Sequence, residues 1–241
     1  MREVLTILEE WGDEYKMSWG REKTALLVYG DQRAPDYQIS GGPVTPIEKA
    51  TALGVDINNK GTADAMIEKV VNGVARMTGC IRHNLRYRDD EILKFIYNVY
   101  VKGKLLFGSE MWHQVDKKQY AKLWDAHANF WKLSPKGEPP EGVIAPRRQM
   151  MYQDMVYAWK WKNGKLPYDW NETHTQKTGK SRGATAGDLV TFYQKKKVRQ
   201  NTFSERIIPW WNGTKVETRN KHLDAYKTDV LEWVTKICFR Q

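Results

Sequence analysis

Apolar residues recur at helical spacing in several stretches of this chain, separated by polar, Gly-rich or Pro-rich stretches. The first covers residues 2–11, and Gly12 follows it at a position where a helix would stop. Another begins at the cap-like Thr62. Each stretch has apolar residues on one face: Val4, Leu5, Leu8 and Trp11 in the first, and Met66, Ile67, Val70, Val71, Val74 and Met77 in the second. We expect two amphipathic helices, with Trp11 buried against the second.

Further helices are indicated by caps and by apolar spacing. Asp89 and Asp116 stand where an N-cap side chain would accept hydrogen bonds, and they predict helices over residues 90–101 and 117–133. Asp188 is a similar candidate for a helix that continues through residue 199. Apolar spacing predicts two more helices, over residues 147–161 and 219–239.

Turn-forming residues separate these helices. Residues 23–29 form a short apolar run that fits a strand or a buried helical turn. Residues 30–61 are rich in Gly, Pro, Asp and Asn, which predicts irregular structure broken by one helix from Pro46 to Leu53. Residues 171–188 are expected to form a polar loop, and residues 209–213 a turn.

A Pro-rich segment is the best candidate for a domain boundary. We expect a helical domain over residues 1–133, a linker over residues 134–146 and a basic, Trp-rich, mostly helical region over residues 147–241. The fold class that this organisation predicts is mainly α.

The segment from Asp89 to Trp131 has the outline of a helix-turn-helix, although an ordinary helix hairpin has the same outline. In a helix-turn-helix, the first turns of the second helix enter the major groove of DNA. The side chains in those turns can reach phosphates or base edges. These candidate DNA-binding residues are Lys117, Lys118, Gln119, Tyr120 and Lys122.

The excess of positive charge lies almost entirely in the C-terminal part. Residues 133–241 contain 20 Lys and Arg against 11 Asp and Glu, whereas residues 1–132 contain 19 against 18. This asymmetry favours a surface that binds a polyanion, although basic charge can also serve solubility alone. The candidates for contact with nucleic acid or polymerase are Arg147, Arg148, Lys177, Lys180, Arg182, Lys195, Lys196, Lys197 and Arg199.

Aromatic residues are interspersed among these lysines and arginines. Their rings could stack on unpaired nucleic-acid bases or pack into a core. They are Trp159, Trp161, Tyr168, Trp170, Phe192 and Tyr193.

The composition offers little for catalysis or for a cofactor. The two cysteines, Cys80 and Cys238, and the five dispersed histidines match no metal-binding spacing. Four carboxylates could assemble a Mg²⁺ nuclease site only if the fold brought them together: Asp154, Asp169, Asp188 and Glu205. We expect no enzyme activity, no cofactor, no metal and no membrane span.

Two segments resemble one protein family. The start, Met-Arg-x-Val-x-x-Ile-Leu-Glu-x-Trp-Gly, and the middle, Asp64-Ala65-Met66-Ile67 followed by a helix that ends in Tyr100-Val101-x-Gly103, are similar to phage late-gene antitermination proteins called Q. The resemblance covers residues 1–19 and 62–132, in the branch without zinc-binding cysteines. The turn over residues 108–115 departs from the family pattern, and the basic C-terminal region has no recognised counterpart.

The resemblance implies a transcription antitermination factor in the host bacterial cytoplasm. Such a protein binds double-stranded DNA at a late promoter through its helix-turn-helix, and it joins host RNA polymerase that carries a sigma factor. Polymerase then reads through terminators, because the factor narrows the RNA-exit channel; nascent RNA is a further candidate partner. The alternative is another basic phage protein that binds nucleic acid, such as a Mg²⁺-dependent nuclease or a blocker of a host defence enzyme.

Overall fold

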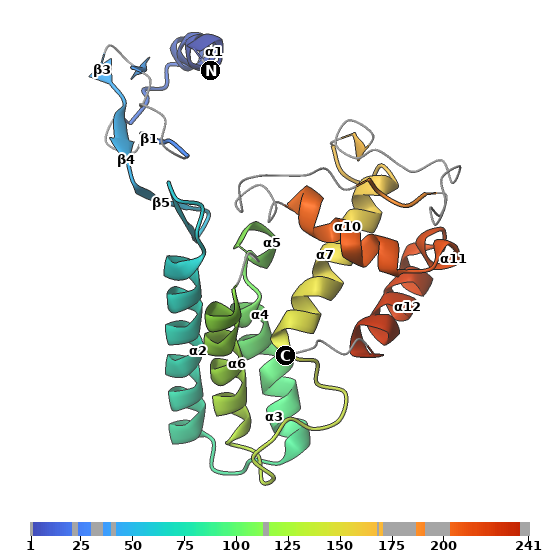
Figure 1. The fold of residues 1–241 in the computed structure, drawn as a ribbon. Coiled ribbons are helices and arrows are strands. Elements are labelled where there is room, and N and C mark those ends of the chain that lie inside the picture. Colours follow the sequence, from blue (N-terminus) through green and yellow to red (C-terminus); the bar gives the residue numbers. More distant parts are fainter. Residues whose placement is uncertain are drawn as a thin grey trace. The chain divides into compact units, whose positions relative to one another are not determined.

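The computed structural model describes residues 2–20, 24–29, 36–39, 42–112, 116–167, 169–170, 187–190 and 203–236. The protein is mainly helical, as the sequence predicts (Figure 1). It divides into two compact units, residues 1–66 and 67–241, and the Pro-rich segment over residues 134–146 falls inside the second. No helix in the described part of the chain is long and apolar enough to cross a membrane.

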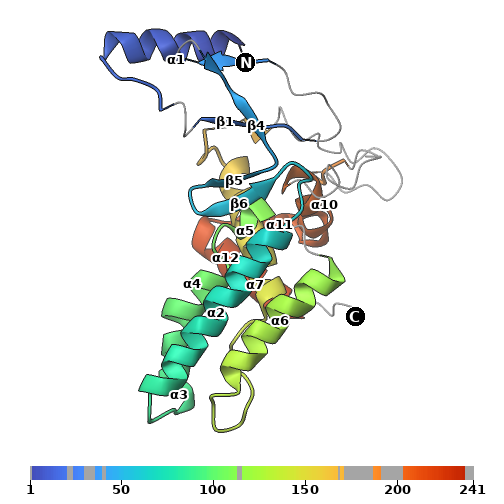
Figure 2. The same cartoon turned by 90° about the vertical axis from the view of Figure 1, so that its left-hand side faces the viewer.

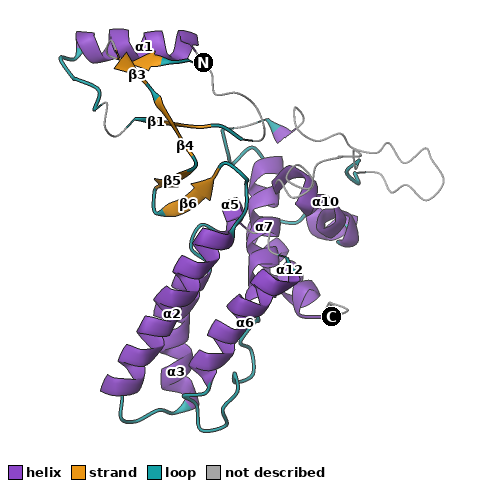
Figure 3. Ribbon diagram, turned by 60° about the vertical axis from the view of Figure 1, so that its left-hand side comes forward, coloured by secondary structure: helices purple, strands orange, loops and turns teal. Residues whose placement is uncertain are grey.

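The first unit holds the N-terminal helix and short paired strands (Figure 3). Helix α1 (Arg2–Glu14) begins the unit. The strands pair as β1 (Ala25–Leu27) with β4 (Thr45–Ile47) in parallel, β2 (Gln38–Ile39) with β3 (Gly42–Pro43), and β5 (Lys49–Ala52) with β6 (Val55–Asn58), the last two pairs antiparallel. The apolar run at residues 23–29 therefore contains a strand, one of its two predicted structures.

The helix predicted from Pro46 to Leu53 is wrong, because β4 and β5 occupy this stretch. Leu53 and Gly54 both have positive φ, 50° and 84°, which is the backbone geometry of a tight hairpin turn between β5 and β6. The hydroxyl of Thr51 donates a hydrogen bond of 2.8 Å to Asp56 on the opposite strand. Cross-strand pairing therefore outweighs the helical spacing of this short segment.

Trp11 is 43% exposed within its own unit, and its burial against the helix that starts at Thr62 stays a prediction. Its ring lies 5.1 Å from that of Tyr15 and 6.5 Å from that of Trp19. The indole N–H of Trp19 donates to the carbonyl of Leu8 at 3.1 Å. The chain after α1 thus folds back onto the helix and forms a local aromatic cluster.

Helix α2 (Asp64–Asn84) follows Thr62 as predicted, and four of its apolar residues are buried: Met66, Ile67, Val70 and Val74. The next helical stretch is continuous and consists of α3 (Asp90–Ile96), the π-helix η2 (Tyr97–Val101) and α4 (Lys102–Leu105). Asp89 caps it as predicted, accepting a hydrogen bond of 2.7 Å from the backbone N–H of Ile92. Helix α4 lies beside α2 (Figure 2). The aliphatic stem of Lys104 lies over Gly73, where an added Cβ would come within 2.7 Å of Lys104 Cε. A glycine there leaves room for the lysine side chain.

The predicted turn before the next helix contains a short helix of its own, α5 (Ser109–Trp112). Helix α6 (Lys117–Trp131) then begins after Asp116, as predicted. The ring of Tyr97 lies 5.5 Å from Phe130 and 5.0 Å from Trp131, near the end of α6. This contact packs α6 against the α3–η2–α4 stretch. The helix-turn-helix interpretation of these elements stays a prediction.

The C-terminal helices share an apolar core of their own. They are α7 (Pro146–Lys162), α10 (Phe203–Gly213), α11 (Val216–Arg219) and α12 (Leu223–Lys236). The fully buried part of the core includes Met155, Ala158, Ile207, Trp211, Tyr226, Val230 and Val234. The predicted helix over residues 147–161 is confirmed.

Two predictions for the C-terminal helices are wrong. The expected turn over residues 209–213 is the end of α10, with Pro209 inside the helix. Burial of Ile207, Ile208 and Trp211 on one side of α10 offsets the backbone hydrogen bond that Pro209 cannot donate. The last helix begins at Leu223 rather than at Arg219, because the short helix α11 ends at Arg219 with Asn220 as its C-cap.

Candidate nucleic-acid interface

The start of α6 is fixed by a reciprocal pair of hydrogen bonds between Asp116 and Gln119. The backbone N–H of Gln119 donates to Asp116 Oδ1 at 2.8 Å, and the backbone N–H of Asp116 donates to Gln119 Oε1 at 2.9 Å. Gln119 is buried, at 9% exposure. Gln119 therefore stabilises the helix terminus through its side-chain oxygen, and its role in reading DNA bases stays a prediction.

Lys117, Lys118 and Lys122 are exposed on the first two turns of α6. Neither α6 nor α7 has an acidic residue in its first turn, and α7 has Arg147 and Arg148 there. By contrast, seven other described helices have Asp or Glu in the first turn: α1, α2, α3, α5, α10, α11 and α12. Basic residues at the positive end of a helix dipole cost stability, so helix formation does not explain them.

The structure brings these two helix starts together. The guanidinium carbon of Arg147 lies 5.6 Å from the ring centroid of Tyr120. Burial raises the pKa of Tyr120, and the charges of Arg147 and Arg148 oppose that rise. We define the α6–α7 basic patch as Lys117, Lys118, Tyr120, Lys122, Arg147 and Arg148. Two groups of residues that the sequence suggested separately thus meet at the contact between Tyr120 and Arg147.

The N-terminus of α7 also has no side-chain cap. Pro146 occupies the first turn, and Ala145 at the N-cap position has no side chain that could accept a hydrogen bond. The backbone of Arg147 forms a hydrogen bond with the Tyr120 side chain, which also opposes the rise in the pKa of Tyr120. The start of α7 is therefore tied to α6, and it contributes its basic side chains to the α6–α7 basic patch.

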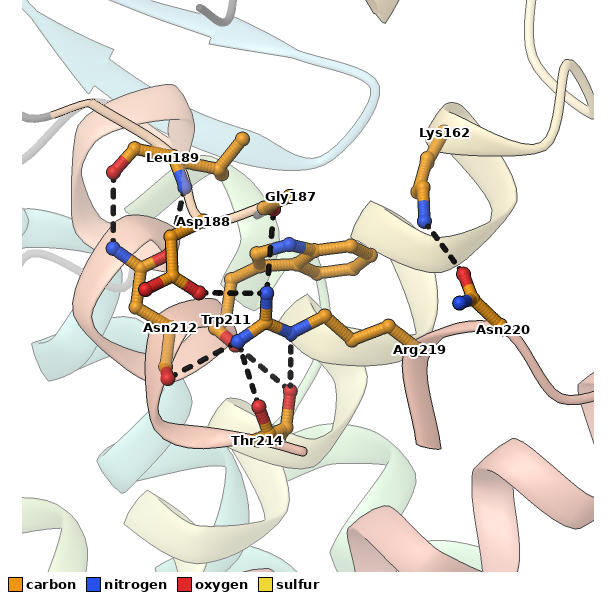
Figure 4. A network of polar contacts seen from close by, with 9 residues as sticks. All are labelled: Lys162, Gly187, Asp188, Leu189, Trp211, Asn212, Thr214, Arg219 and Asn220. Atoms are coloured by element: carbon orange, nitrogen blue, oxygen red, sulfur yellow. Dashed lines mark hydrogen bonds and ion pairs between the residues drawn. The ribbon is translucent and has the colours of Figure 1, made fainter. Parts of the chain in front are cut away.

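A buried polar network holds a separate segment, residues 187–190, onto the end of α10 (Figure 4). Arg219 is 3% exposed and pairs with the carboxylate of Asp188 at 2.9 Å. It also donates to the carbonyls of Gly187, Asn212 and Thr214 and to the hydroxyl of Thr214. Its guanidinium carbon lies 5.7 Å from the Trp211 ring centroid. The predicted N-cap role of Asp188 is wrong, because residues 189 and 190, which directly follow it, are not helical.

The side chain of Asn212 also holds residues 187–190 at the end of α10. Its amide donates to the carbonyl of Leu189 at 3.0 Å and accepts from the N–H of Leu189 at 2.8 Å. The predicted contact residues that flank residues 187–190 in the sequence lie outside the described residues. They are Lys177, Lys180, Arg182, Lys195, Lys196, Lys197 and Arg199. The rest of the helix predicted after Asp188 also lies outside them.

The aromatic residues of the C-terminal region serve the core where they are described. Trp159 and Trp170 are 7% and 4% exposed, and Trp161 packs against the same core. Stacking on nucleic-acid bases is therefore ruled out for Trp159 and Trp170, which are buried, whereas Trp161 is partly buried. Tyr168, Phe192 and Tyr193 lie outside the described residues.

The candidate nuclease carboxylates do not form one site. Asp154 is 1% exposed and makes a two-pronged ion pair with Arg206, with both N···O distances 2.9 Å, and Asp188 pairs with Arg219. Arg206 also donates to the carbonyl of Glu110, so the pair joins α5, α7 and α10. In the described ranges, no three His, Cys, Asp or Glu side chains are grouped so that they could hold a metal ion.

Comparison with known proteins identified no relative. The chain matches no protein family, no curated protein and no solved structure.

Proposed function

We propose that this protein binds the phosphate backbone of duplex DNA through the α6–α7 basic patch. The observation that carries the proposal is the meeting of two helix N-termini whose first turns hold Lys117, Lys118, Arg147 and Arg148 and no acid. When basic side chains neutralise phosphates, the cations condensed on the DNA are released. This release supplies a large share of the binding free energy. The exposed lysines meet that requirement.

We further propose that the DNA is a phage late promoter and that the protein acts as a transcription antitermination factor, without catalysis. The resemblance of residues 1–19 and 62–132 to the Q proteins supports this step. In this proposal the segment from Asp89 to Trp131 acts as a helix-turn-helix. Host RNA polymerase with its sigma factor is the protein partner in the bacterial cytoplasm, and nascent RNA is a further candidate partner.

Transcription in vitro tests the proposal directly. The template carries the phage's own late promoter followed by a terminator, and the full chain is added to host polymerase holoenzyme. We expect read-through to increase with this protein and not with the K118E/R147E variant. A template with an unrelated promoter is the control for specificity.

Two results would contradict the proposal. Unchanged termination on the cognate promoter overturns the antitermination role, and wild-type affinity of K118E/R147E for duplex DNA overturns the patch. Metal-dependent cleavage of bare DNA would favour the alternative of a nuclease instead.

A further inference from the structure

A small cavity lies where the α3–η2–α4 stretch meets the first turn of α7. Its volume is about 40 Å³. A water molecule needs roughly 10–15 Å³ measured in this way, so the cavity has room for about three waters or one small anion. Its lining residues are Lys94, Tyr97, Asn98, Lys102, Gly142, Val143, Ile144 and Gln149.

The charged side chains of the lining are both cationic. Lys94 Nζ donates to the carbonyl of Glu141 at 3.3 Å, which uses one of its three N–H groups. The ammonium group of Lys102 is half-buried, and among the described residues it has neither an ion pair nor a hydrogen bond. Burial lowers the pKa of Lys102, because nothing in the described lining compensates its charge.

Gln149 supplies a third polar group to the cavity. The residue is 6% exposed and lines the cavity, and its side-chain amide bonds to no residue in the described part of the chain. The amide atoms are not sealed off from solvent, so their N–H groups are open to an occupant of the cavity. Gln149 also lies in the first turn of α7, where the helix dipole favours negative charge.

We propose that this cavity binds one phosphate group, held by the ammonium groups of Lys94 and Lys102 and by the side-chain amide of Gln149. A tetrahedral oxyanion can accept hydrogen bonds from all three groups and neutralise the buried charge. The source of the phosphate is the backbone of bound nucleic acid, and this part rests on the proposed function. The first turn of α7 that carries Gln149 also carries Arg147 and Arg148 of the α6–α7 basic patch.

Titration of the full chain with inorganic phosphate tests the cavity without any nucleic acid. Binding is measured by calorimetry and by the rise in the unfolding midpoint. K94M and K102M keep the aliphatic stems and remove one charge each, and we expect each to weaken phosphate binding about tenfold or more. K104M is the matched control, because Lys104 is on the same helical stretch but packs over Gly73.

Gln149→Glu gives a second readout that does not depend on lost affinity alone. It is nearly isosteric and places a carboxylate beside the two lysines. We expect it to abolish phosphate binding and to raise the unfolding midpoint without phosphate, because the new charge replaces the anion. A lower midpoint in Q149E, no phosphate binding by the wild-type protein, or equal weakening in K104M overturns the phosphate site.

Duplex DNA identifies the source of the phosphate. Each phosphate contact contributes about −0.9 to the slope of log K against log salt, so K94M and K102M should each reduce that slope by about one. If phosphate binding is lost in these variants while the slope stays unchanged, the site binds a free phosphate, and nucleic acid as its source is overturned. If the wild-type protein binds phosphate but no DNA, the proposed function fails and the phosphate site stands.

Discussion

The hydroxyl of Tyr97 lies 2.8 Å from Nδ1 of His127, inside the helical core of the second unit. The two rings meet edge-on at 77°, and His127 is 1% exposed. Burial lowers the pKa of His127 to about 4 and raises that of Tyr97. The pair is therefore neutral in the folded protein at physiological pH, and protonation of His127 would place an uncompensated charge in the core.

The folded protein should lose stability as the pH falls from 6.5 towards 4. In this range the unfolded chain protonates His127 at its ordinary pKa, whereas the folded chain does not, so the free energy of unfolding falls with pH. The lowering of the pKa of His127 from 6.5 to about 4 corresponds to a loss of about 3 kcal/mol in the free energy of unfolding. Urea denaturation at pH 7 and pH 4.5 measures it. His127→Gln, which cannot titrate, should show a smaller loss, and an equal loss in this variant would contradict the assignment.

Replacing Arg219 with methionine should destabilise the C-terminal core by about 3–5 kcal/mol, because Asp188 would remain buried without its partner. Methionine keeps an aliphatic stem beside Trp211 while it removes the hydrogen bonds to residues 187–214. The measurement is urea denaturation of single and double variants. Asp188→Asn in the R219M background should recover part of the loss, and strict additivity of the two changes would argue against a direct ion pair.

Leu53→Asn should stabilise the β5–β6 hairpin by about 1 kcal/mol. Leu53 is 98% exposed and has a φ of 50°, a left-handed conformation that costs leucine more than asparagine. The side chain loses no packing in the exchange. Hydrogen exchange of the amides in β5 and β6 should slow in the variant. Gly54→Ala, at a φ of 84°, should have the opposite effect.

The parts of this fold that depend on local chemistry could be predicted from the sequence. Asp89 and Asp116 were recognised as caps because an N-cap bonds to residues only three positions away. The β5–β6 hairpin was missed because its turn, Leu53-Gly54, lacks the Asn-Gly or Asp-Gly pair typical of such turns. Pro209 signalled a break that tertiary packing of α10 overrides.

The candidate site shows the same division between local and distant contacts. The lysines of α6 and the arginines of α7 were each named from charge and helical position. Their meeting depends on the Tyr120–Arg147 contact across the loop between α6 and α7, which no local rule gives. The cavity was missed altogether, although Lys94, Asn98 and Lys102 recur every four residues. That spacing was a usable signal for one polar face.

Lys118→Glu should change stability and DNA binding in opposite directions. Lys118 is exposed in the first turn of α6, where the helix dipole disfavours a positive charge, so the reversal should stabilise the protein by about 0.3–1 kcal/mol. The same reversal should weaken binding to duplex DNA and lower the salt slope by about one, because a phosphate contact is lost. Denaturation and salt-dependent binding on one preparation measure both effects. Lys132→Glu, at the C-cap of the same helix, is the matched control and should lower stability while leaving DNA affinity near that of the wild type. Equal losses of affinity in K118E and K132E would mean that only the net charge matters. That result would remove the reason for assigning DNA binding to this helix terminus.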